Sequence, residues 1–390
     1  MKAPFAGLTA AEFLRRHWQK RLLLVRGALA QYADLVQPGT LFELAGRGDL
    51  ESRLVLRHGR RWQVRHGPFE RRELRGLPRS NWTLLVQGVN HAMPAAQQLL
   101  GEFSFIPYAR LDDLMVSYAP DGGGVGPHFD NYDVFLLQGE GRRRWRVSRQ
   151  RDLELVAGAP LKILRRFRSA REWVLEPGDV LYLPPRCAHD GIAAGGGCIT
   201  YSIGFRAPDA QELGARFLDD VQDRLRLSGI YEDPGLQPPR HPARLGDDML
   251  RDARKVLQRI RWNGGDVASF LGRHLTEPKP HVIFSRPVRP LTARAFAARA
   301  ECGGVLLAAP TRMLFRGGTF FINGEAHPAG TAAARLLARL ADRRSLPPRS
   351  RPGRESAQLL YQWYRAGYIC LGDGSVSRGG RGAPGNLPGI

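Results

Sequence analysis

Three side chains in this sequence have the types and the spacing of a metal site. His128 and Asp130 stand two residues apart in the segment Gly122–Val147, which reads GGGVGPHFDNYDVFLLQGEGRRRWRV. On an extended strand, residues two apart face the same side, so one strand could present both side chains to a single metal ion. The third candidate is His189 in PPRCAHDG. It follows PGDVLYLPP at Pro177–Pro185, a turn and an apolar strand that could return the chain to the same place.

Two imidazoles and one carboxylate form the facial triad of non-haem iron enzymes, which leaves neighbouring positions on the metal for other ligands. An isolated His-x-Asp pair is a weak signal, because a single histidine is more often a core or surface residue. The glycine-rich approach at Gly122–Gly126, which permits close packing, and the strand-forming block before His189 strengthen it. The residues therefore favour an Fe(II) site at His128, Asp130 and His189.

A basic residue follows the His-x-Asp pair at a useful distance. Arg142, Arg143 and Arg144 stand in a predicted strand, where the middle side chain faces opposite to its two neighbours. A 2-oxoglutarate that chelates iron needs a cation for its far carboxylate, and arginine can pair with a carboxylate through two parallel hydrogen bonds. Arg143 is the candidate for this role. The alternative is that all three arginines are solvated surface residues.

The elements that must position these residues are mainly short strands. Up to about Arg206, short apolar or alternating runs are separated by Gly, Pro and Asp, which is typical of a sandwich or barrel. A helix is expected over Ala11–Leu24, running into an early strand. The expected strands are Thr83–Val89, Leu114–Tyr118, Val134–Gln138, Arg144–Val147, Val180–Leu183 and Ile199–Phe205.

Beyond Phe205 the pattern becomes helical. Apolar residues at helical spacing predict a helix between Pro208 and Gly229, and the proline-rich stretch Asp233–Pro242 is interpreted as a linker. The tail from Ser375 is rich in Gly and Arg and is expected to be disordered. Further helices, and a hairpin around Gly317 and Gly318, resemble a winged-helix module; the segments are Asp247–Ile260, Val267–His274, Leu291–Arg299, Met313–Phe315, Thr319–Asn323, Ala332–Leu340 and Ser356–Tyr364.

Charge and cysteine content narrow the class of protein. The formal net charge of +21 over 390 residues favours an anionic partner such as nucleic acid or a ribonucleoprotein. Nearly all the basic residues are arginine, so genome composition is an equally open explanation. No C-x-x-C pair occurs, which argues against a structural zinc site and a disulfide framework and favours a cytoplasmic setting. No secretory signal or membrane-spanning run is found, so no membrane partner is expected.

Four segments resemble the Jumonji-C-type cupin oxygenases, and in particular the bacterial ribosomal oxygenases, which hydroxylate an arginine of large-subunit ribosomal protein L-sixteen. They are Phe13–Gly27 (FLRRHWQKRLLLVRG), Leu111–Val147, Pro177–Pro185 and Thr200–Pro208 (TYSIGFRAP). The resemblance covers most of the chain. It implies an α+β protein with a double-stranded β-helix (cupin/JmjC) oxygenase domain at residues 1–207, a helical dimerisation region at 208–275, a winged-helix-like domain at 276–374 and a tail at 375–390. It also implies a homodimer.

The resemblance carries roles over residue by residue. His128, Asp130 and His189 match the family's iron ligands, and Arg143 matches the arginine that holds the 2-oxoglutarate carboxylate. Cys187 and Ala188 stand where bulkier residues or proline are common in the family, which leaves the wall of the pocket open.

Four further residues are assigned secondary roles. Ser117 and Thr200 would contact the cosubstrate from flanking strands, unless they are ordinary polar strand residues. Tyr118 and Asp121 precede the glycine run near the expected mouth, where an aromatic ring could stack on a substrate guanidinium and a carboxylate could bind it. Asp121 could equally be a turn residue.

The expected function is Fe(II)- and 2-oxoglutarate-dependent 3-hydroxylation of an arginine in a large-subunit ribosomal protein, close to the ribosome or its RNA. Two alternatives keep the same site and change the target to histidine hydroxylation or lysine demethylation. A third is non-catalytic, with the cupin as the scaffold of a basic nucleic-acid-binding protein. The enzymatic alternatives share the triad and differ only at the rim of the pocket.

Overall fold

The N-terminal half of the protein is built on two facing β-sheets. The computed structural model describes residues 5, 7–59 and 61–372, so the predicted tail from Ser375 lies outside the described residues. The larger sheet has the order β1-β9-β6-β11-β5-β4-β2-β3 and the smaller one β10-β7-β8. The strands are β1 (Leu23–Val25), β2 (Ser52–His58), β3 (Arg61–His66), β4 (Trp82–Val86), β5 (Leu111–Ala119), β6 (Val134–Gln138), β7 (Arg143–Ser148), β8 (Arg171–Leu175), β9 (Val180–Leu183), β10 (Ala188–Ala193) and β11 (Cys198–Phe205).

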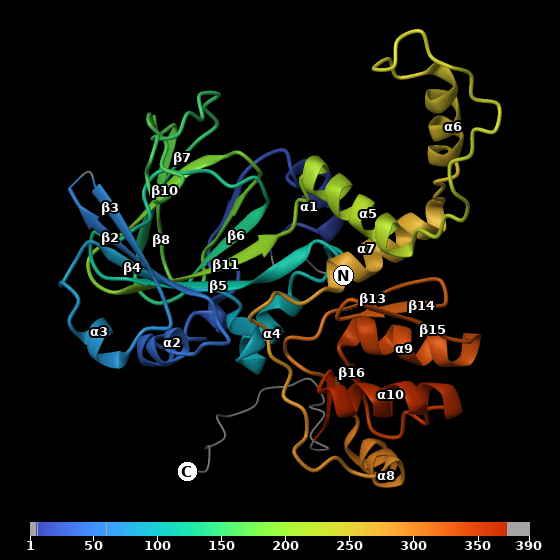
Figure 1. The fold of residues 1–390 in the computed structure, drawn as a ribbon. Coiled ribbons are helices and arrows are strands. Elements are labelled where there is room, and N and C mark those ends of the chain that lie inside the picture. Colours follow the sequence, from blue (N-terminus) through green and yellow to red (C-terminus); the bar gives the residue numbers. More distant parts are fainter. Residues whose placement is uncertain (1–4, 6, 60, 373–390) are drawn as a thin grey trace.

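The chain crosses repeatedly between the two sheets, as the strand order requires. β6 belongs to the large sheet, β7 and β8 to the small one, β9 to the large one, β10 to the small one and β11 to the large one again. All the pairings in both sheets are antiparallel, and Figure 1 shows the sheets curving around a common interior. This is the double-stranded β-helix that the sequence predicted.

Short helices cover the outer face of the large sheet. They are α1 (Ala10–Arg16), α2 (Pro38–Ala45), α3 (Arg71–Arg75) and α4 (Pro94–Gly101). Phe13 of α1, Leu41 of α2 and Leu99 of α4 are fully buried in one core with strand residues such as Leu114 and Phe135. The helices therefore fix one face of the large sheet and leave the other face to the interior between the sheets.

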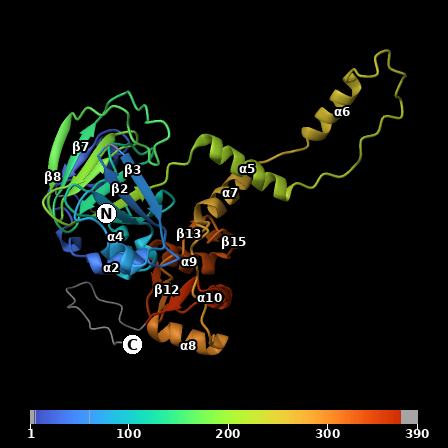
Figure 2. The same ribbon diagram turned by 60° about the vertical axis from the view of Figure 1, so that its left-hand side comes forward.

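Two helices form an arm that projects from the body of the molecule. Neither α5 (Ala210–Arg224) nor α6 (Asp247–Leu257) has a buried residue, and Figures 1 and 2 show α6 standing far from both halves of the chain. The third helix, α7 (Gly264–Thr276), returns to the body. There Gly272 lies so close to the Phe321 ring that a Cβ would come within 2.3 Å of it.

The C-terminal part packs around its own core. Phe296, Phe320, Leu337 and Trp363 are buried together, each from a different element. The elements are α8 (Ala293–Gly303), β12 (Val305–Leu307), β13 (Met313–Arg316), β14 (Thr319–Ile322), β15 (Glu325–Pro328), α9 (Thr331–Arg343), β16 (Ser345–Leu346), α10 (Arg354–Ala366) and β17 (Ile369–Leu371). None of the helices in the described ranges is both long enough and apolar enough to cross a bilayer.

Several sequence-based boundaries change in the structure. The helix predicted over Ala11–Leu24 ends at Arg16, and the chain turns before β1 begins. The capping box between Thr9 and Glu12 fixes its start, where the Thr9 side chain accepts from the Glu12 backbone. β4 ends at Val86, because the backbone then turns at Gly88 in the left-handed region. The strands predicted at 134–138 and 180–183 have the bounds of β6 and β9.

Candidate metal centre

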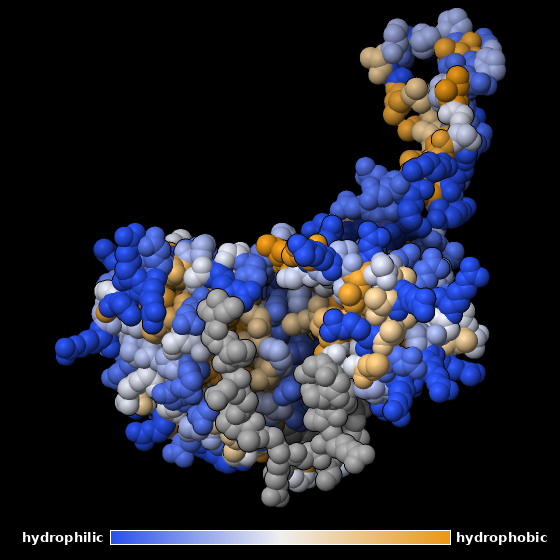
Figure 3. Space-filling view, turned by 90° about the horizontal axis from the view of Figure 1, so that it is seen from below, coloured by the Kyte–Doolittle hydropathy of each residue, from blue (hydrophilic) through white to orange (hydrophobic). Residues whose placement is uncertain are grey.

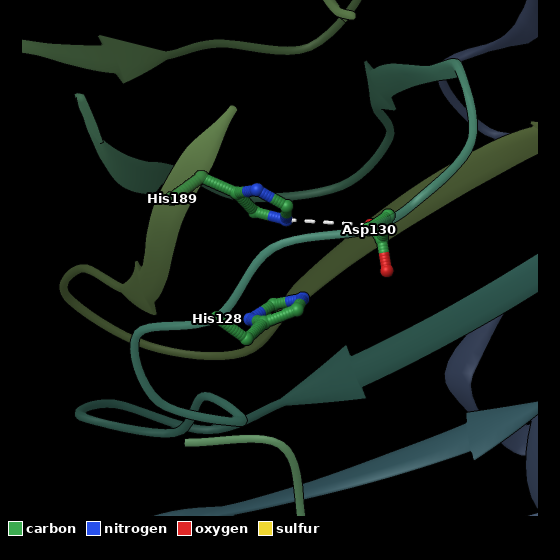
Figure 4. A group of neighbouring side chains, drawn as sticks. All are labelled: His128, Asp130 and His189. Atoms are coloured by element: carbon green, nitrogen blue, oxygen red, sulfur yellow. Dashed lines mark ion pairs between the residues drawn. The ribbon is translucent and has the colours of Figure 1, made fainter. Parts of the chain in front are cut away.

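His128, Asp130 and His189 come together in the interior between the sheets. Each offers one ligand atom, and these atoms all lie within 4.8 Å of one another. The Nε2 atom of His189 is 3.7 Å from the Oδ2 atom of Asp130, and the two imidazole rings are 4.2 Å apart at their centroids. Figure 4 shows the three side chains converging from two segments of the chain. Two neutral nitrogens and a carboxylate at this separation could hold one metal ion.

His128 and Asp130 do not lie on a regular strand, in contrast to the expectation from the sequence. The pair lies on an irregular segment before β6, and His128 forms only an isolated bridge with His189 of β10. In that bridge each backbone N–H donates to the other residue's carbonyl, at 2.9 and 2.8 Å. The backbone N–H of Arg186 donates to the carbonyl of Asp130 at 2.7 Å. These bonds to the β9–β10 connection thus bring the ligand atoms to the same side without a regular strand.

Both histidines are oriented by carbonyl groups behind them. The Nδ1 atom of His128 lies 2.8 Å from the Gly126 carbonyl oxygen, and that of His189 lies 2.9 Å from the Cys187 carbonyl oxygen. When Nδ1–H donates to these carbonyls, the Nε2 lone pairs face the cluster, as in many histidine metal sites. Burial, together with the nearby His128, lowers the pKa of His189 to about 4. His189 is therefore neutral near pH 7, which is the form that binds a metal.

Glycines allow the close packing that the sequence predicted around this segment. A Cβ on Gly124 would come within 2.5 Å of the Gly191 carbonyl oxygen, and one on Gly126 within 2.7 Å of the Trp62 ring. Larger side chains at these positions would push the His128 segment away from β10. The glycine-rich approach is thus a packing requirement of the site.

The cluster opens into a cavity of about 660 Å³ between the two sheets. Its walls come from β5, β6 and β11 on one side and from β7 and β10 on the other, and the segment 155–163 contributes a further wall. Within it lie the three clustered residues, Arg143, Ser117 and Thr200. The cavity has room for a small dicarboxylate and part of a peptide side chain.

Arg143 points into this cavity, whereas Arg142 and Arg144 are exposed, as the strand alternation predicted. Only 4% of Arg143 is exposed, and within the described part of the chain its side chain makes one hydrogen bond, from Nη2 to the Cys198 sulfur at 3.4 Å. Its buried Nε has no partner, and among the described residues no carboxylate lies within ion-pair distance of its guanidinium. A buried cation without a counter-charge is costly, so this arrangement suits an anionic ligand.

Ser117 and Thr200 face each other on paired strands of the cavity wall. They are register partners between β5 and β11, and the Ser117 hydroxyl donates to the Thr200 carbonyl at 3.4 Å. The Thr200 hydroxyl donates to the side chain of Gln138 at 3.2 Å. Both residues therefore lie where the sequence placed them, on the wall of the cavity that also contains Arg143.

Tyr118 and Asp121 do not reach the cavity, in contrast to the expected substrate-binding role. Tyr118 follows Ser117 on β5 and faces the opposite side, where its ring packs against Phe42 and Trp82. Asp121 lies in a turn, and its carboxylate accepts a hydrogen bond at 2.8 Å from the backbone of Gly195, in the connection between β10 and β11. The turn interpretation of Asp121 is the one that agrees with the structure.

Sequence reasoning missed three residues that line the same cavity. Asp113 and Met115 alternate with Ser117 along the inner face of β5, and Tyr132 lies beside Asp130. The signal was available, because residues at steps of two on a strand share a face with Ser117. Burial, followed by the neighbouring Asp112, raises the pKa of Asp113. Arg143 and the Asp113 carboxyl group thus lie on separate parts of the cavity wall.

Two family models match separate parts of the chain. One is described as a JmjC domain and matches residues 98–213, and the other as a ROXA-like winged helix and matches residues 259–369. The predicted winged-helix fold is confirmed by the second match, which begins early enough to include α7.

The curated relatives include ribosomal oxygenases. The chain is 36% identical over 316 residues to the ribosomal protein uL16 3-hydroxylase of Escherichia coli, covering 80% of this chain and 84% of that protein. It is 40% identical over 261 residues to a protein of Haemophilus influenzae described as a probable ribosomal oxygenase, covering 65% and 62% of the two chains.

Solved structures agree with these relatives. The X-ray structure of YcfD from Escherichia coli has a TM-score of 0.82 at 31% identity and covers 95% of this chain and 100% of that chain. The structure of the same ribosomal oxygenase in complex with cobalt and 2-oxoglutarate has a TM-score of 0.80 at 32% identity, with coverage of 94% and 98%.

Proposed function

Because this chain belongs to the JmjC-type bacterial ribosomal oxygenases, we propose that it hydroxylates carbon 3 of an arginine side chain in the large-subunit ribosomal protein uL16. The chain is a 2-oxoglutarate-dependent oxygenase with Fe(II) as its metal. The specific arginine target rests on the name of the Escherichia coli relative and on the carboxyl group of Asp113 in the cavity.

The observation that carries the proposal is the unpaired Arg143 in the same cavity as the His128, Asp130 and His189 cluster. When bound, Fe(II) with 2-oxoglutarate supplies the oxidising power that places one oxygen atom of O2 on a C–H bond and the other in succinate. His128, Asp130 and His189 would hold the metal. Arg143 would pair with the far carboxylate of the cosubstrate, and Ser117 and Thr200 would border it.

The carboxyl group of Asp113 suits a guanidinium. Asp113 lies four residues before Ser117 on β5 and shares its face of the strand. Because each residue of a strand advances the chain by about 3.4 Å, the two side chains are separated along the cavity wall. Met115 between them offers apolar contact for the methylene groups of an arginine, and Tyr132 offers a ring face. Asp113 would then hold the far end of the side chain while its carbon 3 lies nearer the metal cluster.

The test is oxidation of a uL16 peptide that bears the arginine. The protein is loaded with Fe(II) and 2-oxoglutarate without oxygen, oxygen is admitted, and the peptide is sequenced by mass spectrometry. One added oxygen atom on arginine, absent with His128→Ala and without 2-oxoglutarate, is the expected result. Oxidation of histidine or loss of a methyl group from lysine in matched peptides would favour the alternative targets. Folded, iron-loaded protein that oxidises none of them would favour the non-catalytic scaffold.

We also propose the domain division 1–207 for catalysis, 208–275 for self-association and 276–374 for the winged helix. The arm supports a homodimer, because apolar side chains of α6 are exposed, whereas Phe217 of α5 packs against Trp262 and Phe270. Met249, Leu250, Val256 and Leu257 are exposed on one face of α6, and Figure 3 shows apolar side chains along the arm. An isolated amphipathic helix of this length is marginal in water without a surface to pack against.

The net charge supports contact with RNA close to the substrate protein. Residues 208–275 carry equal numbers of basic and acidic side chains, whereas residues 276–390 carry nearly three basic residues for each acidic one. An arginine-rich genome would raise the charge of both regions, so the uneven distribution favours a function. This proposal, with a cytoplasmic location beside the ribosome, predicts that binding to ribosomal RNA weakens steeply with salt. If the affinity for ribosomal RNA falls with salt no more steeply than that of a neutral protein, the proposed contact with RNA is excluded.

A further inference from the structure

Asp112 and Asp113 form an acidic pair at the junction between the β5 end of the cavity and the C-terminal half of the chain. Asp112 has three cationic partners: Arg206 at 3.1 Å, Arg312 at 3.0 Å and Lys279 at 3.3 Å. Burial alone would raise the pKa of Asp112. The pKa is nevertheless held below its usual range by the positive charges of Lys279, Arg312 and Arg206. Asp112 would therefore remain well paired if one of its partners left.

Asp113 depends on a single cation. Its Oδ1 atom accepts from the Gln87 amide at 2.6 Å, and its Oδ2 atom accepts from the Lys279 ammonium at 2.9 Å. Among the described residues, no other basic side chain lies within ion-pair distance of Asp113. Asp113 is 2% exposed, whereas 30% of the Lys279 side chain is exposed. The cation on Asp113 thus has a path to solvent that the carboxylate lacks.

The backbone around Lys279 is restrained while its side chain is free to move. Lys279 stands between Pro278 and Pro280, and prolines restrict both their own φ angle and the conformation of the residue before them. Thr276, just upstream, is buried, and its hydroxyl accepts from the Gly324 backbone at 3.1 Å. The ammonium can therefore leave Asp113 by rotation of the lysine side chain alone, without movement of the C-terminal core.

We propose that Lys279 occupies, in the substrate-free protein, the position on Asp113 that the guanidinium of the substrate takes, and that this competition makes the site select arginine over lysine. The proposal rests on the function proposed above. A guanidinium presents two parallel N–H groups that fit one carboxylate, which an ammonium cannot do. An incoming arginine therefore gains a bond that Lys279 does not make.

An incoming lysine gains nothing over the residue that it must displace. Its ammonium would make the bond that Lys279 already makes, and Lys279 is tethered to the site, which gives it a high effective concentration. Lys279 is thus a specificity-determining residue that acts by excluding a weaker cation.

The experiment measures binding of two labelled uL16 peptides, with arginine or lysine at the target position, by fluorescence anisotropy without oxygen. In Lys279→Met, the arginine peptide should bind on the order of tenfold more tightly. The affinity of the lysine peptide should rise by a larger factor, so the ratio of the two affinities should become smaller. In Lys279→Arg, a guanidinium already pairs with Asp113, so both peptides should bind more weakly while the melting temperature stays at least as high. Lys20→Met, a change at an exposed lysine near the N-terminus, is the matched control.

The outcomes separate this inference from the proposed substrate. Weaker binding of both peptides by a common factor in Lys279→Met, with a lower melting temperature, would show a structural tie and overturn the inference. If Lys279→Met does not fold, peptide binding to the folded Lys279→Arg variant tests the inference. Unchanged affinity of that variant for both peptides would overturn the inference as well. A wild-type chain that neither binds nor oxidises the arginine peptide, but takes up metal and 2-oxoglutarate, would instead overturn the proposed substrate.

Discussion

Arg143 places a positive charge where the protein offers it no counter-charge. Replacing it with methionine keeps much of the volume and removes the proposed partner of the 2-oxoglutarate carboxylate. Losing one member of a buried charge pair costs about 2–5 kcal/mol, so Arg143→Met should weaken 2-oxoglutarate binding by roughly 30-fold or more. Calorimetry on the metal-loaded protein without oxygen measures this. Arg144→Met, at an exposed neighbour on the same strand, should bind normally. Equal affinity in the two variants would assign Arg143 a structural role.

Asp113 and Asp121 are two carboxylates whose roles the structure separates. Asp113 lines the cavity, whereas Asp121 lies in a turn outside it and accepts a hydrogen bond from Gly195. Asp113→Asn should therefore raise the KM for the arginine peptide by about 100-fold, the loss expected for a charged hydrogen-bond partner, while the KM for the cosubstrate changes little. Asp121→Asn should change neither value by more than a small factor. Steady-state kinetics with the peptide and the cosubstrate varied in turn would reveal the reverse pattern if Asp121 were the substrate contact.

At the scale of elements, strand alternation explains both what was predicted and what was missed. It turned Arg143 inward between two exposed neighbours, whereas Ser117 was assigned through the family resemblance as a residue of a flanking strand. Tyr118 was assigned by its closeness in sequence to the glycine run, but alternation sends it to the core beside Phe42. The same rule applied backwards from Ser117 finds Met115 and Asp113.

Long-range pairing could not be predicted from local pattern. His128 and Asp130 lie on irregular backbone, and the His128–His189 bridge positions them through residues far apart in sequence. β2, β3, β8 and β10 were not predicted, because they mix charged with apolar residues, so that only pairing with neighbours identifies them as strands. The ion pairs that join Asp112 and Asp113 to Lys279 and Arg312 also connect residues that no local pattern relates.

The contact between η2 (Val89–His91) and the C-terminal half predicts a pH dependence. Burial, together with Arg312 and Lys279, lowers the pKa of His91 to about 4, below its ordinary value of 6.5. The unfolded chain therefore binds a proton that the folded protein excludes. Stability from this group is complete above about pH 6.5 and is lost as the pH falls toward 4, by up to about 3 kcal/mol.

Urea denaturation of the metal-free protein at several pH values tests this contribution. The free energy of unfolding of His91→Gln should fall less between about pH 6.5 and pH 4 than that of the wild type. His58→Gln, at an exposed histidine at the end of β2, should follow the wild type, and other titrating groups cancel in the comparison. Parallel curves for His91→Gln and the wild type would show that His91 is not the group responsible.

At the scale of the whole molecule, the projecting arm is the feature that one chain leaves unexplained. Leu250→Asp on the apolar face of α6 should convert a dimer to a monomer, because a charge on that face would be buried without a partner in the dimer. Light scattering on the eluting protein gives the mass directly. Asp247→Asn, on the exposed first turn of the same helix, should leave the dimer intact. A monomeric wild type at micromolar concentration would contradict the self-association of the arm.

The order of the regions could be predicted from the change between strand-like and helical sequence patterns, whereas the contacts between the regions could not. The change from strands to helices after Phe205 and the hairpin around Gly317 appear in the structure with small shifts of bounds. The charge pattern showed excess arginine but not that Arg312 and Arg206 are used internally at Asp112. Counting charges therefore overstates the surface left for an anionic partner.

The most informative single measurement is a crystal structure with manganese and 2-oxoglutarate, with the metal located by its anomalous scattering. We expect one metal ion bound by Nε2 of His128, Nε2 of His189 and a carboxylate oxygen of Asp130, at about 2.0–2.2 Å. We also expect the far carboxylate of 2-oxoglutarate to pair with the Arg143 guanidinium. A metal bound elsewhere, or a cosubstrate whose carboxylate lies away from Arg143, would contradict the assignment of this cavity as the oxygenase site.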